Sequence, residues 1–202
     1  MTIWRGKAPL ILASQSRARQ MLLGNAGIAF EAVPADIDER GLQEASQLKA
    51  PGEIAARLAR EKALFVSAKM VGRTVIGADQ TLALGDRLFS KPAGRSQALD
   101  QLRALAGNTH ELHSAVAVAR DGKILFADVA VARMTMRRMG EGEISAYLEA
   151  AGERVTTSVG AYQLEGLGVH LFERIDGDHF TILGLPLLSL LAFLRGQGLL
   201  AV

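Results

Sequence analysis

The chain has 202 residues, of which 49% are hydrophobic, so it is long enough to bury a core as one domain or as two small lobes. It contains no cysteine, which excludes disulfide bonds, thiolate zinc sites and a cysteine nucleophile. Its formal net charge of +2 is small for this length and argues against a nucleic-acid partner, which would require a dense basic stripe.

The sequence also argues against a membrane partner. No uninterrupted apolar run approaches the roughly 18 residues that a membrane span needs. The longest candidate, at residues 183–194, is interrupted by Gly184, Pro186 and Ser189. The first residues lack the apolar stretch of a signal peptide, so we expect a cytoplasmic location.

Strand and helix patterns alternate in the first part of the chain. The expected elements are a strand at residues 9–13, a helix at 17–25, a strand at 28–33, a loop at 35–47 and a helix at 51–70. Pro51 suits the start of the last helix, because the first turn of a helix does not need its N–H group. The loop is expected because this segment is polar and acidic.

In the second part of the chain, the turn-forming pairs Gly85-Asp86 and Asp121-Gly122 each predict a β-hairpin. The expected elements are a strand at 74–78, a hairpin at 82–89, a helix at 96–106 capped by Ser96, strands at 111–119 and 124–136, a helix at 141–150, a strand at 169–175 and a helix at 186–195. No repeat or linker interrupts them. The sequence therefore predicts one α/β domain over residues 1–202, with a mixed sheet flanked by helices.

The first candidate for chemistry is Ser14-Gln15-Ser16-Arg17-Ala18-Arg19, where a strand passes into a helix. Free backbone N–H groups and the positive end of a helix dipole suit phosphate oxygens there. The hydroxyls of Ser14 and Ser16 add donors, and Arg19 has the geometry to bind phosphate through two nitrogens. The alternative is an N-cap serine followed by solvated arginines.

The second candidate is Asp79, which ends an apolar strand, where ligands of α/β sheets bind. Its carboxylate is suited to hold a divalent metal or to orient a water molecule. An Asx turn is the alternative. Glu39 lies in an acidic segment that is suited to bind Mg²⁺ or Mn²⁺ or is an exposed loop.

Two lysines are further candidates. Lys62 lies inside the long predicted helix, and Lys91 precedes a proline, which holds its backbone extended. The alternative for each is a solvated surface lysine.

The glycine-rich segment at residues 160–168 lets backbone approach a ligand closely, and Glu165 within it is suited to face a nucleobase edge. A plain turn is the alternative. The segment is neither a Walker loop nor a dinucleotide fingerprint. His110 and His113 are three apart on a predicted strand and point to opposite faces, and no GxSxG supports a hydrolase triad.

Together these segments resemble the Maf (septum formation inhibitor) family of nucleoside triphosphate pyrophosphatases, from residue 10 to about residue 194. The matching pieces are Leu12-Ala13-Ser14-Gln15-Ser16-Arg17-Ala18-Arg19, Ala59-Arg60-Glu61-Lys62-Ala63, Ile76-Gly77-Ala78-Asp79, Lys91-Pro92, Gly107-Asn108-Thr109-His110, Gly160-Ala161-Tyr162, Glu165-Gly166-Leu167-Gly168 and Gly184-Leu185-Pro186. The resemblance implies an elongated mixed sheet between two lobes around a nucleotide cleft, as in inosine triphosphatases. It also implies hydrolysis between the α- and β-phosphates with Mg²⁺ or Mn²⁺, and a homodimer.

Carried over by position, the resemblance makes Asp79 the general base and Glu39 an acidic catalytic or metal-binding residue. It places Ser14, Arg19, Lys62 and Lys91 on the phosphate side. Whether Asp79 acts as metal ligand or as base stays open.

The base preference follows from three positions. Gln80 and Glu165 resemble the 7-methyl-GTP branch of the family more than the dTTP/UTP branch, and Ala18 matches neither, since the branches carry Trp or Arg there. Arg17 also replaces the usual proline. The alternatives are a dTTP/UTP pyrophosphatase, a purine-directed triphosphatase and a non-catalytic nucleotide sensor that regulates cell division.

Overall fold

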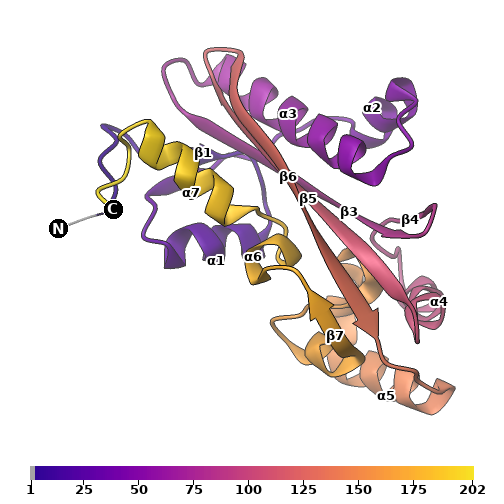
Figure 1. Cartoon of the computed structure of the whole chain (residues 1–202). Helices are drawn as coiled ribbons and strands as arrows, with labels where there is room; N and C mark the ends of the chain where they lie inside the picture. Colours follow the sequence, from indigo (N-terminus) through magenta and orange to yellow (C-terminus); the bar gives the residue numbers. More distant parts are fainter. Residues whose placement is uncertain (1–2) are drawn as a thin grey trace. The chain divides into compact units, whose positions relative to one another are not determined.

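The computed structural model describes residues 3–202 and shows a mixed α/β fold (Figure 1). The strands are β1 (Leu10–Leu12), β2 (Phe30–Ala32), β3 (Val75–Leu84), β4 (Arg87–Phe89), β5 (Thr109–Arg120), β6 (Lys123–Met136) and β7 (Phe172–Asp176). They form a seven-stranded sheet in the order β2-β1-β3-β5-β6-β7, with β4 paired to β3. Since β1 is parallel to β2 and β3 while β4 and β7 pair antiparallel, the predicted mixed sheet is confirmed.

The helices are α1 (Arg17–Asn25), α2 (Glu39–Ser46), α3 (Pro51–Lys69), α4 (Arg95–Leu105), α5 (Glu141–Ala151), α6 (His179–Ile182) and α7 (Leu187–Gly196), with 3-10 turns η1 (Gly152–Thr156), η2 (Val159–Ala161) and η3 (Leu167–Leu171). Within residues 3–202, none of these helices is both long and apolar enough to cross a bilayer.

The chain divides into two compact units. The first comprises Met1–Gln80, Ser114–Ala130 and His179–Val202, and the second comprises Thr81–His113 and Val131–Asp178. Strands β3, β5 and β6 therefore run from one unit into the other. The two units correspond to the two predicted lobes, while the single domain over residues 1–202 stays a prediction.

Side chains of alternating direction build two core layers in the first unit. On β1, Leu10 and Leu12 join a core cluster that includes residues of α1 and α7, whereas Ile11 packs in another cluster with Val66 of α3. Figure 1 shows α3 on one side of the strands and α1 and α7 on the other. Burial on both faces explains why the β1 sequence is a continuous apolar run.

Helix α3 approaches the sheet closely because both surfaces carry small residues. Alanines of α3 and of β5 form one buried cluster: Ala55, Ala59, Ala63, Ala115, Ala117 and Ala119. Gly77 of β3 lies under the same helix, and a Cβ there would stand 2.1 Å from the carbonyl oxygen of Ala59. The helix is therefore seated at a distance that only glycine permits at this point.

The second unit contains the β3–β4 hairpin, β7 and the helices α4 and α5. The hairpin pairs Leu82 with Phe89, as predicted from its turn at Gly85-Asp86. Strand β7 pairs with the end of β6, with an irregularity between Thr135 and Met136. Helix α4 contacts both α5 and η2, so that it lies at the centre of the contacts in this unit.

Four predictions about local structure are wrong. The predicted loop at 35–47 contains α2, which Asp38 caps by accepting a hydrogen bond from the Gly41 N–H. None of its residues is buried, and its apolar side chains are those of Leu42 and Ala45. Ser96 does not cap α4, whose N-cap is Gly94. The predicted strand at 74–78 continues to Leu84, and the first part of the strand at 169–175 is η3.

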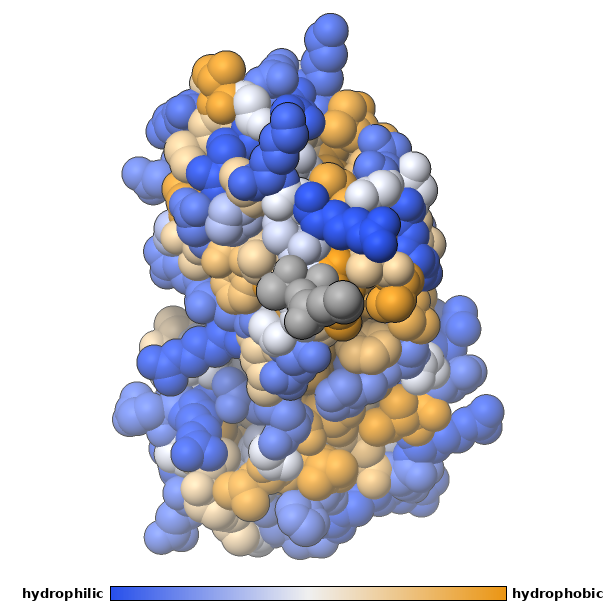
Figure 2. Space-filling model, turned by 90° about the vertical axis from the view of Figure 1, so that its left-hand side faces the viewer, coloured by the Kyte–Doolittle hydropathy of each residue, from blue (hydrophilic) through white to orange (hydrophobic). Residues whose placement is uncertain are grey.

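Apolar patches alternate with hydrophilic side chains on the face shown in Figure 2. The exposed large apolar residues are Ile3, Met21, Val71, Leu125, Val129, Val131, Leu167, Val169, Ile175, Leu188 and Val202. They come from many separate elements.

Candidate active site

The first sequence motif forms the turn between β1 and α1. Ser16 is the N-cap of α1, and its side chain accepts a hydrogen bond from the Arg19 N–H at 3.4 Å. The Ser14 hydroxyl oxygen accepts from the Ser16 N–H at 3.2 Å. Ser14 is buried and Ser16 half-buried. The N-cap alternative is thus correct for Ser16, while the Ser14 hydroxyl proton is still available to a ligand.

The Arg19 guanidinium connects three segments of the first unit. Its Nε donates to the Gly184 carbonyl at 2.7 Å, and its Nη1 donates to the Ala78 carbonyl at 2.9 Å and to Ser14 Oγ at 3.2 Å. The alternative of a solvated arginine is therefore wrong for Arg19. Two of its three nitrogens bind the protein, and in the described part of the chain, residues 3–202, no hydrogen bond uses Nη2, which we assign to a ligand.

Two carboxylates converge on one buried ammonium. Lys62 Nζ lies 2.6 Å from Asp79 Oδ1 and 2.8 Å from Glu39 Oε1. Lys62 and Asp79 are 8% and 7% exposed, whereas the Glu39 side chain is 52% exposed. The solvated-lysine alternative is therefore wrong for Lys62. The Asx-turn alternative does not describe Asp79, whose carboxylate pairs with a lysine on another element.

Burial is the largest influence on the pKa values of Asp79 and Arg19. It raises the pKa of the Asp79 carboxyl above its ordinary value, and the charges of Lys62 and Arg19 offset part of that effect. Burial also lowers the pKa of Arg19, against the opposing effect of Asp79 and Glu39. A raised carboxyl pKa is what a general base that works near neutral pH requires.

The side chains available to bind a metal ion in this cluster are the carboxylates of Asp79 and Glu39. Among residues 3–202 no group of three or more histidine, aspartate or glutamate side chains has the spacing of a metal site. Asp79 and Glu39 nevertheless lie within hydrogen-bond distance of the same Lys62 nitrogen. Mg²⁺ is commonly bound by one or two carboxylates together with phosphates of the substrate, so this pair fits such an ion.

The Gln80 side chain is held in place by hydrogen bonds to neighbouring residues of the protein. Its Nε2 lies 2.8 Å from Ser114 Oγ and 3.1 and 3.0 Å from the carbonyl oxygens of Thr181 and Ile182. The side-chain amide therefore uses its donors inside the protein. Only its carbonyl oxygen is left to accept a hydrogen bond from a substrate.

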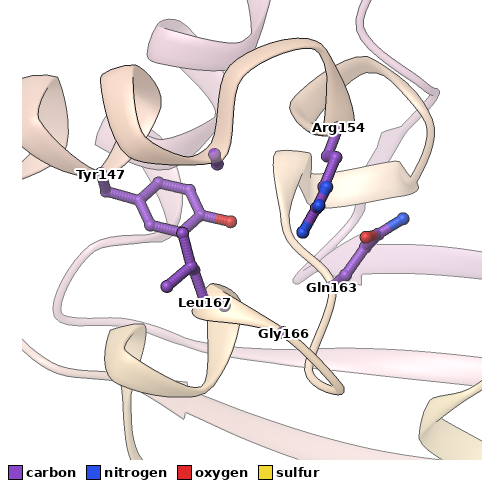
Figure 3. Close-up of a pocket in the computed structure, with 7 residues that line it drawn as sticks. Tyr147, Arg154, Gln163, Gly166 and Leu167 are labelled. Carbon is purple, nitrogen blue, oxygen red and sulfur yellow. The ribbon is translucent and has the colours of Figure 1, made fainter.

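Lys91 and Glu165 belong to the second unit, and both are exposed. Figure 3 shows a hollow lined by Tyr147, Arg154, Gln163 and the residues that follow Glu165 in the chain, Gly166 and Leu167. Its volume is about 10 Å³, which suffices for one water molecule. This hollow is therefore too small to hold a nucleobase, and the role of Glu165 stays a prediction.

Several polar contacts were not predicted from the sequence. Gly184 lies in a matching motif, but its φ of +90° and its bond to Arg19 appear only in the fold. Ser114 supports Gln80 from β5. Gln101, buried in α4, binds the backbone of two loops. Ser114 and Gln101 are common residue types within an ordinary strand and an ordinary helix, so no sequence signal marks them as functional.

Comparisons with known proteins agree with the motifs. A family model described as Maf-like protein matches residues 9–197. A protein of Bradyrhizobium diazoefficiens named nucleoside triphosphate pyrophosphatase is 73% identical over 202 residues, which is 100% of both chains. A protein of Rhizobium etli named 7-methyl-GTP pyrophosphatase is 54% identical over 192 residues, 94% of this chain and 96% of the other. A solved dITP/XTP pyrophosphatase of Mycobacterium abscessus aligns with 95% of each chain at 16% identity and a TM-score of 0.40.

Proposed function

The chain belongs to the Maf-like protein family, and from this premise we infer that it is a nucleoside triphosphate pyrophosphatase. Water attacks the α-phosphorus, the bond from that phosphorus to the α–β bridging oxygen breaks, and pyrophosphate leaves with the electron pair. The products are a nucleoside monophosphate and pyrophosphate. The observation that carries this proposal is the buried Lys62 that holds Asp79 and Glu39 beside Arg19.

Asp79 is the residue that we assign to the attacking water. Its Oδ1 accepts from Lys62 Nζ, whereas among residues 3–202 no hydrogen bond reaches Oδ2. Oδ2 is therefore the atom that takes the water proton, and the raised pKa of this carboxyl favours the transfer near neutral pH. Lys62 keeps the carboxylate oriented and turns its remaining N–H toward the phosphates.

We infer that the cluster works with a divalent cation, Mg²⁺ or Mn²⁺, for which Glu39 and Asp79 are the candidate ligands. Asp79 acts either as base or as ligand, not as both at once. Two cations, Arg19 and Lys62, face two carboxylates, so the cluster has no surplus positive charge for a polyphosphate. The bound ion would supply that charge on the phosphate oxygens. Ser14 and Arg19 Nη2 contribute further donors on the phosphate side, and Lys91 is assigned to the same role from the second unit.

For the base we propose a preference for 7-methyl-GTP. Glu165 accepts the N–H donors on the guanine edge, whereas uracil and thymine would set a carbonyl oxygen against it. The Rhizobium etli relative bears this activity in its name. Gln80 contributes only its carbonyl oxygen, because Ser114, Thr181 and Ile182 take up its amide donors.

A nucleotide panel tests both levels of this proposal. The enzyme is incubated with 7-methyl-GTP, GTP, UTP, dTTP and inosine triphosphate, with Mg²⁺, Mn²⁺ or EDTA, and pyrophosphate is resolved from orthophosphate. We expect pyrophosphate only when the metal is present. Tight binding without turnover would favour the nucleotide sensor, and a preference for dTTP or UTP would overturn the base assignment alone.

Three further predictions accompany the proposal. We expect a homodimer, which light scattering after size exclusion would detect, and a cytoplasmic location, where the nucleotide pool is. One cooperative unfolding transition would support a single domain over residues 1–202.

A further inference from the structure

The amide side chain of Gln101 joins two separate loops of the second unit. Its Nε2 donates to the Ser90 carbonyl at 2.8 Å, and its Oε1 accepts from the Gly160 N–H at 3.1 Å. Gln101 lies on α4 and is 6% exposed. Because one partner is an acceptor and the other a donor, the amide fits in one orientation only, and a flipped amide would lose both bonds.

The first of these loops carries Lys91. Its backbone is fixed on both sides, since the Ser90 carbonyl is bound by Gln101 and the following Pro92 is buried. Proline also keeps Lys91 extended. The exposed Lys91 side chain therefore starts from a backbone whose position depends on Gln101.

The second loop, residues 160–168, carries Glu165. Gly160 and Ala161 both have positive φ, of 78° and 61°, which is unfavourable for an alanine and persists only where neighbouring groups enforce it. Tyr147 Oη donates to the Ala161 carbonyl at 3.2 Å, and Tyr162 Oη lies 2.7 Å from His110 Nε2. The buried Gln101 and His110 and the half-buried Tyr147 thus hold the start of this loop.

The rest of the loop is closed on itself. The N–H groups of Gly166 and Gly168 donate to the Gln163 carbonyl at 3.2 and 3.1 Å. A Cβ at Gly168 would stand 2.4 Å from that carbonyl oxygen, so the turn is tight. The turn that carries Glu165 is therefore internally fixed, and its position depends on residues 160–162, where it joins the fold.

We propose that Gln101 is a positioning residue that fixes the Lys91 loop and the Glu165 loop relative to each other within the second unit. The inference rests on the proposed function, in which Lys91 contacts the triphosphate and Glu165 the base. Gln101 itself touches neither substrate nor metal. It acts on the geometry of the two groups that do.

The experiment compares Gln101→Leu, Gln101→Glu and Leu105→Ala with the wild type, using 7-methyl-GTP and UTP. Leu105 is a buried residue one turn further along α4 whose truncation destabilises the protein without removing a side-chain hydrogen bond. For Gln101→Leu we expect KM to rise about tenfold for UTP and by more than that for 7-methyl-GTP, so that the ratio of their kcat/KM values falls toward one. The ratio does not depend on the fraction of folded enzyme.

Gln101→Glu distinguishes the hydrogen bond to Ser90 from the hydrogen bond to Gly160. Its carboxylate still accepts from the Gly160 N–H but has no donor for the Ser90 carbonyl. KM should therefore rise while the nucleotide ratio stays near the wild-type value. Leu105→Ala should lower Tm and leave both KM and the ratio in place.

Amide hydrogen exchange gives a measurement that does not need activity. Gln101→Leu should accelerate exchange in peptides that cover residues 90–93 and 160–168 together, and Leu105→Ala should not. Unchanged KM, ratio and exchange in Gln101→Leu would overturn the inference. If the wild type releases no pyrophosphate from any nucleotide, the proposed function fails, and the exchange result decides alone whether Gln101 couples the loops.

Discussion

Within residues 3–202, the buried ionic residues Lys62 and Asp79 belong to the first unit, whereas the buried polar residues of the second unit, Gln101 and His110, are neutral. Asp79, within β3, stabilises Lys62 of α3 and Arg19 of α1 as ions, and they stabilise its carboxylate in turn. Gln101 and the His110–Tyr162 pair, by contrast, exchange hydrogen bonds without charge. Burial lowers the pKa of His110 to about 4 and raises that of Tyr162, so both stay neutral at physiological pH.

The difference has a physical reason. A cluster that acts on a polyphosphate must bear charge, and the cost of burying that charge is offset by opposite charges at short distance. A network that only holds loops gains nothing from charge and is cheaper to bury when it is neutral and hydrogen-bonded. Each of the following variants changes one side of this comparison.

The largest effect is expected for Asp79→Asn, which removes one charge from the first unit at nearly constant shape. Turnover should fall by about 10²–10⁴, because the amide cannot take the water proton. The protein should still fold, since a neutral group is easier to bury than a carboxylate. Steady-state kinetics and thermal unfolding measure the two effects. Near-native turnover of the folded variant would refute the assignment.

The second effect concerns the neutral network and its response to pH. The folded-state pKa of His110, about 4, lies below its ordinary value of 6.5. The unfolded chain therefore takes up a proton between these values that the folded chain does not. This contribution to stability is complete above about pH 6.5 and is lost as the pH falls toward 4, by roughly 3 kcal/mol in total.

Urea unfolding at pH 7 and at pH 4 measures this loss in the wild type and in His110→Gln, which has no titrating ring. We expect the variant to be less stable at pH 7 but to lose less on acidification. Equal losses in both proteins would show that His110 is not the group responsible.

Gly77→Ala tests the close approach that brings Lys62 to Asp79. A Cβ at Gly77 would stand 2.1 Å from the Ala59 carbonyl oxygen and 2.6 Å from the Ala63 nitrogen, so α3 must move. We expect a loss of about 1–3 kcal/mol in stability from overpacking, with a fall in kcat. Gly24→Ala in α1 is the control, since nothing lies within 4 Å of its Cβ. A native kcat in Gly77→Ala would show that catalysis does not depend on the close approach of α3 to the sheet.

The smallest effect is expected at the exposed Glu165. Glu165→Gln should narrow the preference for 7-methyl-GTP over UTP by roughly fivefold, since a neutral acceptor makes a weaker hydrogen bond and an amide can also donate. Ratios of kcat/KM for the two nucleotides measure it, with Glu173→Gln on β7 as an exposed control. An unchanged ratio would remove Glu165 from base recognition.

The sequence alone determined most of the elements and the family. The helix predicted at 17–25 coincides with α1, and the turn signals at Gly85-Asp86 and Asp121-Gly122 form hairpins. These features depend on neighbours in the chain: apolar periodicity, capping residues and turn-forming pairs. The motifs sufficed for the Maf assignment, because their order along the chain is itself distinctive.

The tertiary structure decided what each polar group binds. Lys62 and Asp79 are bonded although they lie 17 residues apart in the sequence, and Arg19 and Gly184 although they lie 165 residues apart. No local sequence pattern encodes such pairings. Helix α2 was not predicted because its segment is polar and acidic, whereas the Asp38 cap and contacts with α3 hold it as a helix. The sequence supplied the residues capable of the chemistry. Only the fold brought three segments within hydrogen-bond distance of Arg19 and two loops within hydrogen-bond distance of Gln101.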